Sequence, residues 1–561
     1  MFKPLPEHRN DLISFSFLFL TLGVVYSSCV YFKYVFHNDV FFWFKLDENS
    51  FHQMPHYENI VNGRYAAAWL IDLQGLLVHN VSDLRILRFL AILLLSCNAY
   101  VFLRQIRRIG WSDLELLLIT LAIFILPGFA DSIFNVSNDY LLLSVLFACW
   151  AFSLAERSKG FFVPTIILLT SITFYQTAAM FYWTMTGMSL LFTRNRFEGV
   201  FKYKMIRVLG IGLLSLLSYA FLIFLMSFFW GHKVFNSYNV YKPTFDLLTK
   251  LHWFFREPLL NALNLWGIFP KWTSAFMVLG FIVSGVLLSF SSKLVQIKRE
   301  DRLGAVMNIL GQFGFFIVLL ILSFLPNLIA QLNAPWYRCL VPLTCLICLV
   351  LIWSLDQWTK FLPVPIGRIV RVILLSVAVI YGGIKTFDNV LYYRVLPSHI
   401  EWQAYRSMAQ NISSRQKDKI YIICPDFIGF DRYDEFGVLT SQSLEDVFPL
   451  LISAFRENKG QEGGMPPFIY ISLPEDNRVL RMNEFIFMKD PGGKWYSKRA
   501  GSRDRFQEFD PVSKLGSALP VDRGTYETQE PIPLDALLKQ NPYILNLRQL
   551  FSPMEYIKII K

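Results

Sequence analysis

One acidic residue is a candidate for proton-transfer chemistry. Asp39 lies in the segment FHNDVFFWF, a few residues after a long apolar run that begins near residue 12. Aromatic neighbours exclude water from a carboxylate, which raises its affinity for protons and suits it to act as a general base. The simpler interpretation is a carboxylate that only ends the apolar segment, because most isolated carboxylates have structural roles.

Other polar residues stand at the ends of other apolar runs. Arg64 opens the apolar stretch of NGRYAAAWL, and Asp131 and Asp139 flank the turn in PGFADSIFNVSNDYLLL. Gln176 interrupts SITFYQTAAMFYW, and Arg338 follows NLIAQLNAPWY at the start of another run. If these runs are membrane spans, ionisable groups at their ends are functional-site candidates by default. We expect them to converge on one cavity.

Each of these residues also has a structural interpretation. Arg338 could be an interfacial anchor whose charged end reaches toward water. Asp139 could be the N-cap of the helix that follows it. Gln176 could make a hydrogen bond between two helices. The sequence leaves these alternatives open.

Composition identifies lipid as the second solvent. The chain has 561 residues, of which 54% are hydrophobic and 17% are charged, whereas about 25% are charged in a typical soluble protein. A water-soluble core cannot bury 53 Phe, 25 Tyr and 14 Trp with so little charge to cover them. A soluble enzyme, a disulfide scaffold and a disordered chain are therefore excluded for the chain as a whole.

Apolar runs predict a polytopic α-helical membrane protein. About eleven stretches have the roughly 17–25 residues that a spanning helix needs: 12–35, 84–103, 112–128, 139–155, 161–175, 177–192, 206–230, 273–292, 305–326, 338–356 and 367–386. Residues 128–138 and 327–337 contain no Lys or Arg, whereas the alternate connections are basic. The positive-inside rule then places the N-terminus in the cytoplasm.

This topology divides the chain into two domains. Residues 1–390 form a multi-span domain with two large outer loops, 36–83 and 231–272, and residues 391–561 lie outside the cytoplasm. The net charge of +11 lies entirely in the first domain, because the second has 22 basic and 22 acidic residues. Such an excess indicates anionic lipid headgroups, and no nucleic-acid partner is assigned.

The C-terminal part has the character of a soluble α/β domain. KIYIIC (419–424) and PFIYISL (467–473) have strand composition, and the helical pattern DVFPLLISAFREN lies between them. In the second outer loop, FDLLTKLHWFFREPLLNALNLW predicts a helix that lies in the outer interface.

The polar residues at the outer ends of the spans resemble a known pattern. The pattern resembles the GT-C superfamily of polytopic glycosyltransferases, and more closely the serotype-converting O-antigen glucosyltransferases of bacteria and their phages. The matching residues span about 1–350: Asn38-Asp39, Gly63-Arg64-Tyr65, the turn that ends in Asp139, Tyr175-Gln176, and Arg338 before a Pro-containing span. The chain departs from the pattern at Asn38, where a second acid is expected, which argues against a paired-carboxylate or metal-bridging role.

The resemblance implies a reaction at the outer face of a bacterial inner membrane. A sugar, glucose or another hexose, would pass from a polyprenyl-phosphate carrier to a glycan or glycolipid such as O-antigen. Asp39 would be the catalytic base, and Arg64, Arg338 and, less strongly, Lys242 would stabilise the leaving phosphate. Asn38, Asp139, Tyr175 and Gln176 would complete the substrate site.

Two other functional classes and a metal site are the alternatives to this interpretation. A transporter or flippase for a lipid-linked glycan predicts repeated halves, which the sequence lacks. A non-catalytic glycan assembly factor predicts that the Asp39 carboxylate is dispensable. His37, His52 and His56 suggest a metal site. His52 and His56 have a spacing seen in such sites, but Pro55 breaks the helix that would align them. No cofactor is assigned, and a divalent metal is possible but not supported.

Overall fold

The computed structural model describes most of the first 400 residues and parts of the remainder. The described residues are 7–34, 59–78, 82–157, 160–192, 199–229, 244, 246–265, 271–296, 314–331, 333, 336–396, 398–399, 402–403 and seven strands between 420 and 546. The chain divides into two compact units, Met1–His399 with Glu435–Val438, and Ile400–Asp434 with Leu439–Lys561.

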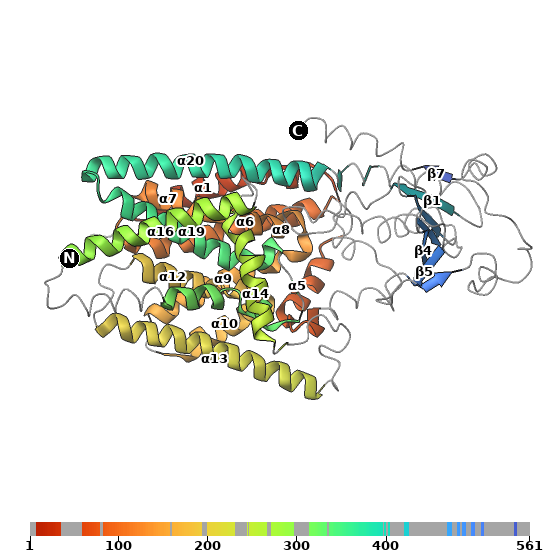
Figure 1. Ribbon diagram of the computed structural model, residues 1–561, viewed down its shortest axis with the longest axis horizontal. Helices are drawn as coiled ribbons and strands as arrows, with labels where there is room; N and C mark the ends of the chain where they lie inside the picture. The colour runs from red at the N-terminus through yellow and green to blue at the C-terminus, as the bar shows by residue number, and fades with distance from the viewer. Residues whose placement is uncertain are drawn as a thin grey trace, which may run out of the picture. The chain divides into compact units, whose positions relative to one another are not determined.

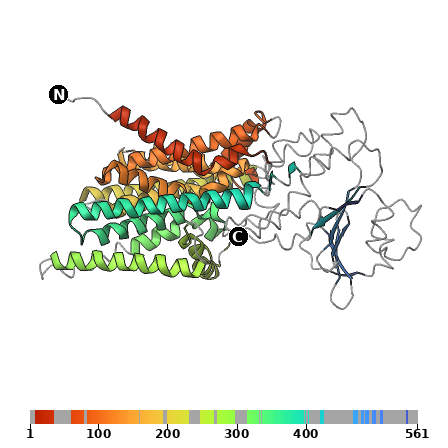
Figure 2. The ribbon, with the colours of Figure 1, turned by 90° about the horizontal axis from the view of Figure 1, so that it is seen from above.

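The first unit is helical, and its long helices run side by side (Figures 1 and 2). Its α-helices are α1 Glu7–Val25, α2 Ser27–Tyr31, α5 Tyr65–Gly75, α6 Leu84–Ile106, α7 Asp113–Phe124, α8 Pro127–Phe134, α9 Tyr140–Arg157, α10 Phe162–Phe174, α11 Gln176–Ala179, α12 Phe181–Phe192, α13 Gly199–Phe229, α14 Leu247–Arg256, α15 Pro258–Leu263, α16 Lys271–Gln296, α18 Leu325–Ile329, α19 Tyr337–Thr359 and α20 Val364–Val390. Residues 314–322 are also helical. Shorter helical turns are η2 Arg107–Ile109, η3 Val136–Asn138 and the π-helix η6 Leu391–Val395.

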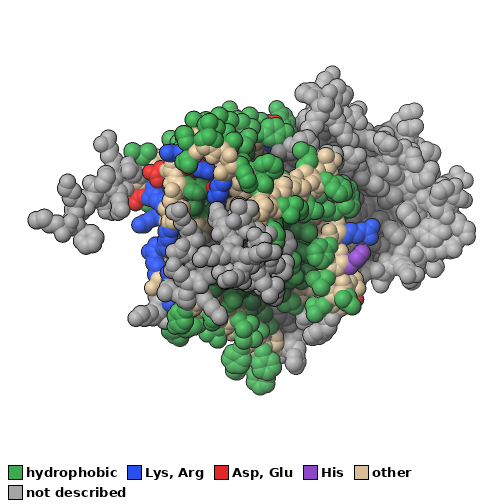
Figure 3. All heavy atoms as spheres, turned by 60° about the vertical axis from the view of Figure 1, so that its left-hand side comes forward, with side chains coloured by type: hydrophobic (Ala, Val, Ile, Leu, Met, Phe, Trp, Pro, Cys, Tyr) green, Lys and Arg blue, Asp and Glu red, His purple; other side chains and the backbone are tan. Residues whose placement is uncertain are grey.

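Six of the described helices are long and apolar enough to cross a membrane, or seven segments if the bent pair α7–α8 forms one span. All eleven predicted spans contain helical residues among those described. Residues 305–313 of one span lie outside the described residues, and others are interrupted, as between α10 and α11, so the number eleven stays a prediction. Exposed apolar side chains such as Phe224 on α13 and Ile380 on α20, each 63% exposed, fit contact with lipid. On the face drawn in Figure 3, hydrophobic side chains cover much of the described surface, and Lys and Arg gather toward one side.

The helix α19 is the core of this unit. In an apolar 18-residue stretch of α19, 89% of the residues are buried, whereas the corresponding share in α20 is 17%. The helix contacts α8, α11, α12, α15 and α16. Its 23 residues make a helix of about 35 Å, which exceeds the roughly 30 Å hydrocarbon thickness of a bilayer. Its first turn and its last turn therefore lie at opposite ends of the helical unit.

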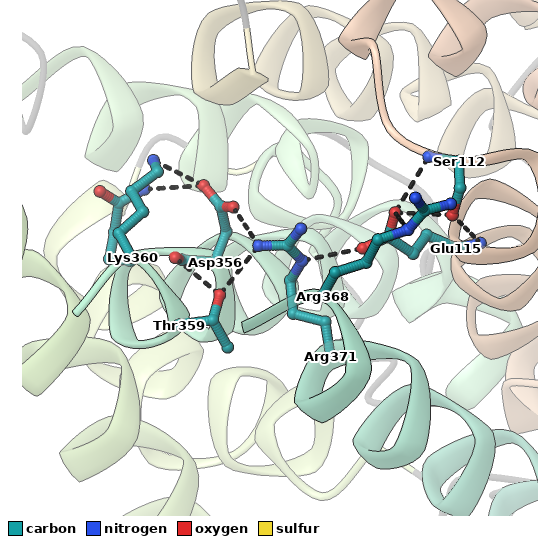
Figure 4. A network of polar contacts seen from close by, with 8 residues as sticks. Ser112, Glu115, Asp356, Thr359, Lys360, Arg368 and Arg371 are labelled. Carbon is teal, nitrogen blue, oxygen red and sulfur yellow. Dashed lines mark hydrogen bonds and ion pairs between the residues drawn. The ribbon is translucent and has the colours of Figure 1, made fainter. Parts of the chain in front are cut away.

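The end of α19 near Thr359 is held by a network of charged residues from three helices (Figure 4). Arg371 of α20 donates to Glu115 of α7 at 2.9 Å and to Thr359 of α19 at 3.0 Å. It also reaches Asp356 at 3.4 Å, and Glu115 forms a capping box with Ser112 at the start of α7. These contacts fasten α7, α19 and α20 together at the end opposite to the first turn of α19.

Both long predicted loops contain helices. The first includes α5, and the second includes α14 and α15. On α14, Leu248 is 82% exposed whereas Trp253 and Phe254 are buried. This division into an apolar exposed edge and a buried edge fits the predicted interfacial helix.

The second unit contains two sheets. One has the order β2-β1-β7, with parallel pairing, and the other has the order β3-β4-β5-β6, with antiparallel pairing. The strands are β1 Ile420–Pro425, β2 Phe468–Leu473, β3 Val479–Met482, β4 Phe485–Lys489, β5 Trp495–Arg499, β6 Gln507–Phe509 and β7 Ile544–Asn546. The segments β1 and β2 lie within one residue of the two strands expected from the sequence. The helix expected between them lies outside the described residues.

Candidate functional site

Arg64 lies among three side chains that come from distant parts of the chain. Its Nε donates to Oε1 of Gln176 at 3.3 Å, and its Nη1 donates to the hydroxyl of Tyr140 at 3.4 Å. The guanidinium carbon lies 4.6 Å from the centroid of the Tyr175 ring. The residue before α5, the first residue of α9 and the break between α10 and α11 thus meet at one point.

The backbone at this point explains the arrangement. Tyr175 is extended, with φ −157° and ψ 110°, and therefore interrupts the helix between α10 and α11. The predicted pair Tyr175-Gln176 accordingly lies at a helix break rather than inside a continuous helix. Gly63 has φ 73°, a left-handed conformation that glycine adopts without the strain that a side chain causes.

Gln176 also contacts the backbone just before Arg64 and the side chain of Tyr219. Its Nε2 donates to the backbone carbonyl of Asn62 at 2.7 Å and to the Tyr219 hydroxyl at 2.6 Å. The Tyr219 hydroxyl in turn donates to the Gly63 carbonyl at 3.2 Å. Both the side chain and the backbone around Arg64 are thereby attached to Gln176.

We expect Gly63→Ala to destabilise the protein and disturb the Arg64 contacts. A Cβ at this position would overlap the Tyr219 hydroxyl, and the φ of 73° would strain any side chain. A non-glycine residue in this conformation costs about 1–3 kcal/mol. The measurement is the thermal unfolding midpoint in detergent, which should fall.

Gly75→Ala is the matched control for this change. A Cβ at Gly75 meets no atom within 4 Å, and alanine favours the helix by about 1 kcal/mol. Its unfolding midpoint should therefore stay the same or rise. An unchanged midpoint for Gly63→Ala would contradict the close approach of Tyr219.

A buried ion pair lies at the first turn of α19. The Nη1 of Arg338 is 3.6 Å from Oδ2 of Asp131, whose side chain is 1% exposed. The same Oδ2 accepts a hydrogen bond of 2.8 Å from Nδ2 of Asn138. Arg338 also lies 4.6 Å from the Trp336 ring centroid, so the guanidinium is held by both a charge and an aromatic face.

The bend between α7 and α8 brings Asp131 to this place. The two helices make an angle of 63°, because Leu126 is extended and Pro127 starts the new helix. One residue further, a Cβ on Gly128 would lie 2.8 Å from the Tyr337 carbonyl oxygen. Glycine therefore allows α8 to pack closely against the beginning of α19, next to Arg338.

Asp139 connects α5 to the start of α9. Its Oδ2 accepts a hydrogen bond of 2.5 Å from Nε2 of Gln74, and both residues are buried. The carboxylate thus accepts from an amide side chain of α5, a contact between two helices that the N-cap interpretation of Asp139 does not include. The contact also orients α5, whose first residue follows Arg64.

Two titratable side chains outside the spans respond to burial. Burial raises the pKa of Tyr65 to about 12, so its hydroxyl keeps its proton at neutral pH. Among the described residues this hydroxyl has no hydrogen-bond partner. Burial lowers the pKa of Lys250 on α14, where the ammonium donates to Asn333 at 2.7 Å and to the Gln331 carbonyl at 3.2 Å.

The structure thus groups most of the predicted residues that it describes. Arg64, Tyr175 and Gln176 are in contact, Arg338 reaches the same group through Asp131 and Asn138, and Asp139 is attached through α5. The predicted base Asp39, Asn38 and the predicted cation Lys242 lie outside the described residues. Side chains that sequence reasoning did not select are Gln74, Asn138, Tyr140, Tyr219 and Lys250.

The charged groups described at this site belong to arginine and carboxylate side chains. Within the described part of the chain, no three His, Cys, Asp or Glu residues are grouped in a way that could hold a metal ion. The three histidines considered for metal binding, His37, His52 and His56, lie outside the described residues.

Comparison with known protein families and with curated proteins finds no match to this chain.

Proposed function

We propose that this protein is a membrane glycosyltransferase of the GT-C type. It moves a hexose such as glucose from a polyprenyl-phosphate carrier to a cell-surface glycan such as O-antigen. The reaction takes place at the outer face of the bacterial inner membrane, with the N-terminus in the cytoplasm and the C-terminal domain in the periplasm.

The observation that carries the proposal is the grouping of Arg64, Gln176 and Arg338 at one end of the membrane helices. Guanidinium and amide groups there come from segments far apart in sequence, and the buried Asp131 carboxylate and the Tyr140 hydroxyl hold the two arginines. Arginine is well suited to phosphate, because its planar fork can donate two parallel hydrogen bonds. A lipid phosphate headgroup lies at the depth of helix ends, whereas its polyprenyl tail lies among the exposed apolar helices.

The proposed chemistry is a single displacement at the sugar. The acceptor hydroxyl oxygen forms a bond to the anomeric carbon while the bond from that carbon to the phosphate oxygen breaks. Asp39 takes the proton of the hydroxyl, and the bond electrons leave with the polyprenyl phosphate. Arg64 and Arg338 stabilise the negative charge that develops on this phosphate, and Asp139 and Gln176 orient the neighbouring segments.

We assign the C-terminal domain to acceptor binding or to closing the site. Parallel strands such as β1 and β2 need a long crossover connection, usually a helix, and 42 residues separate these strands in sequence. This spacing supports an α/β domain.

The decisive experiment supplies the purified protein, in lipid, with a polyprenyl-phosphate hexose and the native glycan of the producing bacterium. Transfer of labelled hexose into the glycan supports the proposal. If labelled lipid instead crosses the bilayer with its sugar still attached, the protein is a transporter. If neither occurs but glycan length changes in cells that lack the protein, it is an assembly factor.

Reporter fusions test the proposed topology. A periplasm-active reporter such as alkaline phosphatase, fused after Asp388, is expected to be active, because α20 ends two residues further, at Val390, an end that the proposed topology assigns to the outer side. A fusion after Arg157, at the end of α9, should be inactive. Activity of the Asp388 fusion only with a cytoplasmic reporter would contradict both the orientation and the outer-face site.

A further inference from the structure

A continuous chain of polar contacts joins Arg64 to Arg338. Arg64 Nη1 donates to the Tyr140 hydroxyl at 3.4 Å, and this hydroxyl donates to Oδ1 of Asn138 at 3.2 Å. Asn138 Nδ2 donates to Oδ2 of Asp131 at 2.8 Å, and Arg338 lies 3.6 Å from that same oxygen. The carboxylate of Asp131 is therefore common to both arginines.

The hydrogen bonds of this chain have one direction. Every donor from Arg64 onward points toward Asp131, so the positive end and the negative end polarise the neutral groups between them. Such chains strengthen cooperatively in a low-dielectric surrounding. Asp131, Asn138 and Tyr140 are all buried, which places the chain in such a surrounding.

Tyr175 joins the two arginines by a second route. Arg64 lies over the Tyr175 ring at 4.6 Å, and the Tyr175 hydroxyl is 3.4 Å from the sulfur of Cys339, the neighbour of Arg338 in sequence. The rings of Tyr140 and Tyr175 also contact each other, with centroids 5.6 Å apart. The two arginines and their connecting residues therefore form a closed ring of contacts.

Packing alone does not account for this ring. A buried ion pair is seldom more stabilising than apolar side chains of similar volume. The pair is also incompletely satisfied, because Oδ1 of Asp131 and Nε of Arg338 have no hydrogen-bond partner among the described residues. The Arg338 side chain is nevertheless 19% exposed, and a guanidinium that is held in place but partly accessible is suited to bind an anion.

We propose that Asp131, Asn138 and Tyr140 are positioning residues that make Arg64 and Arg338 one clamp for the phosphate of the lipid donor. This inference rests on the proposed function and adds to it how the two arginines are held in fixed positions relative to each other. Its consequence is energetic coupling: once the clamp is broken at either arginine, loss of the other should have little further effect.

A double-mutant cycle tests this coupling with decaprenyl phosphate, a sugar-free probe, and the full-length protein in nanodiscs. We expect Arg64→Gln and Arg338→Gln each to weaken binding about tenfold or more, as for hydrogen bonds to charged groups. Two independent tenfold losses would multiply to about a hundredfold, whereas the double variant of a coupled pair should lose at least about fivefold less than that product.

Tyr140→Phe locates the coupling. It removes one hydroxyl from the chain but keeps the ring, both arginines and the Tyr175 route, so the coupling between the Arg64 and Arg338 losses should fall at least about twofold in this background without vanishing. Tyr182→Phe is the matched control, because it removes a buried hydroxyl that donates to the Val208 carbonyl at 2.8 Å. In the control background the coupling should persist.

The outcomes separate the inference from the proposed function. If the wild-type protein binds decaprenyl phosphate no better than uncharged decaprenol, the proposed donor is wrong and the clamp is wrong with it. If it binds the phosphate but the two arginine losses multiply in the wild-type background, only the clamp is wrong. If Arg338→Gln does not fold, Arg338→Lys replaces it in the cycle, because lysine keeps the charge beside Asp131 but lacks the fork.

Discussion

Asp39→Asn is expected to reduce glycosyl transfer by about 10²–10⁴-fold, which is the usual contribution of a general base. The asparagine keeps the size and much of the hydrogen bonding of aspartate but cannot accept a proton. Folding should not depend on charge at this point, because its neighbour Asn38 is already a neutral amide. The measurement is the initial rate of hexose transfer from a polyprenyl-phosphate donor, together with the yield of membrane-inserted protein.

Asp246→Asn is the matched control, since it makes the same chemical change outside the proposed site. Asp246 caps α14 by accepting a hydrogen bond from the Thr249 backbone at 3.2 Å, and asparagine caps helices about as well as aspartate. This variant should keep its transfer rate. Wild-type turnover by Asp39→Asn would remove the general-base role and favour a transporter or an assembly factor.

The helical part of the fold was accessible from sequence because apolar runs must become helices in lipid, where each backbone polar group needs an internal partner. The start of α7 was equally accessible in principle, because Ser112 and Glu115 have the spacing of a capping box. The number of spans was harder to predict. The predicted run 112–128 is divided at Leu126, and the predicted spans 161–175 and 177–192 meet at Tyr175, where in each case an extended residue separates two helices.

The site was only partly accessible for a different reason. Ionisable residues at the ends of spans can be selected one by one from the sequence, as Arg64, Asp139 and Arg338 are. Their partners depend on how the helices pack, and neither the pairing of Arg338 with Asp131 nor that of Asp139 with Gln74 follows from spacing. Tyr219 could not be selected from the sequence, because it lies in an apolar run and its hydroxyl gains a role only through its contacts with Gln176 and the Gly63 carbonyl.

The second large effect is expected at Arg64. Arg64→Gln should lower kcat by about 10²–10³-fold, the range for removing one donor that stabilises developing negative charge. The residue is already oriented by Gln176, Tyr140 and the Tyr175 ring, so little reorganisation is needed when the phosphate leaves. Because this charge grows during bond breaking, the effect should appear more in kcat than in KM for the lipid donor.

Arg64→Lys separates charge from geometry. Lysine restores the positive charge but not the planar fork that donates at once to Gln176 and Tyr140, so transfer should recover only in part. Arg85→Gln is the matched control, because Arg85 also donates through its guanidinium, at 2.8 Å to the Val30 carbonyl, but its contacts among the described residues do not include Arg64, Gln176 or Arg338. Full activity of Arg64→Gln, or equal losses for Arg64→Gln and Arg85→Gln, would show that Arg64 supports the fold rather than the leaving phosphate.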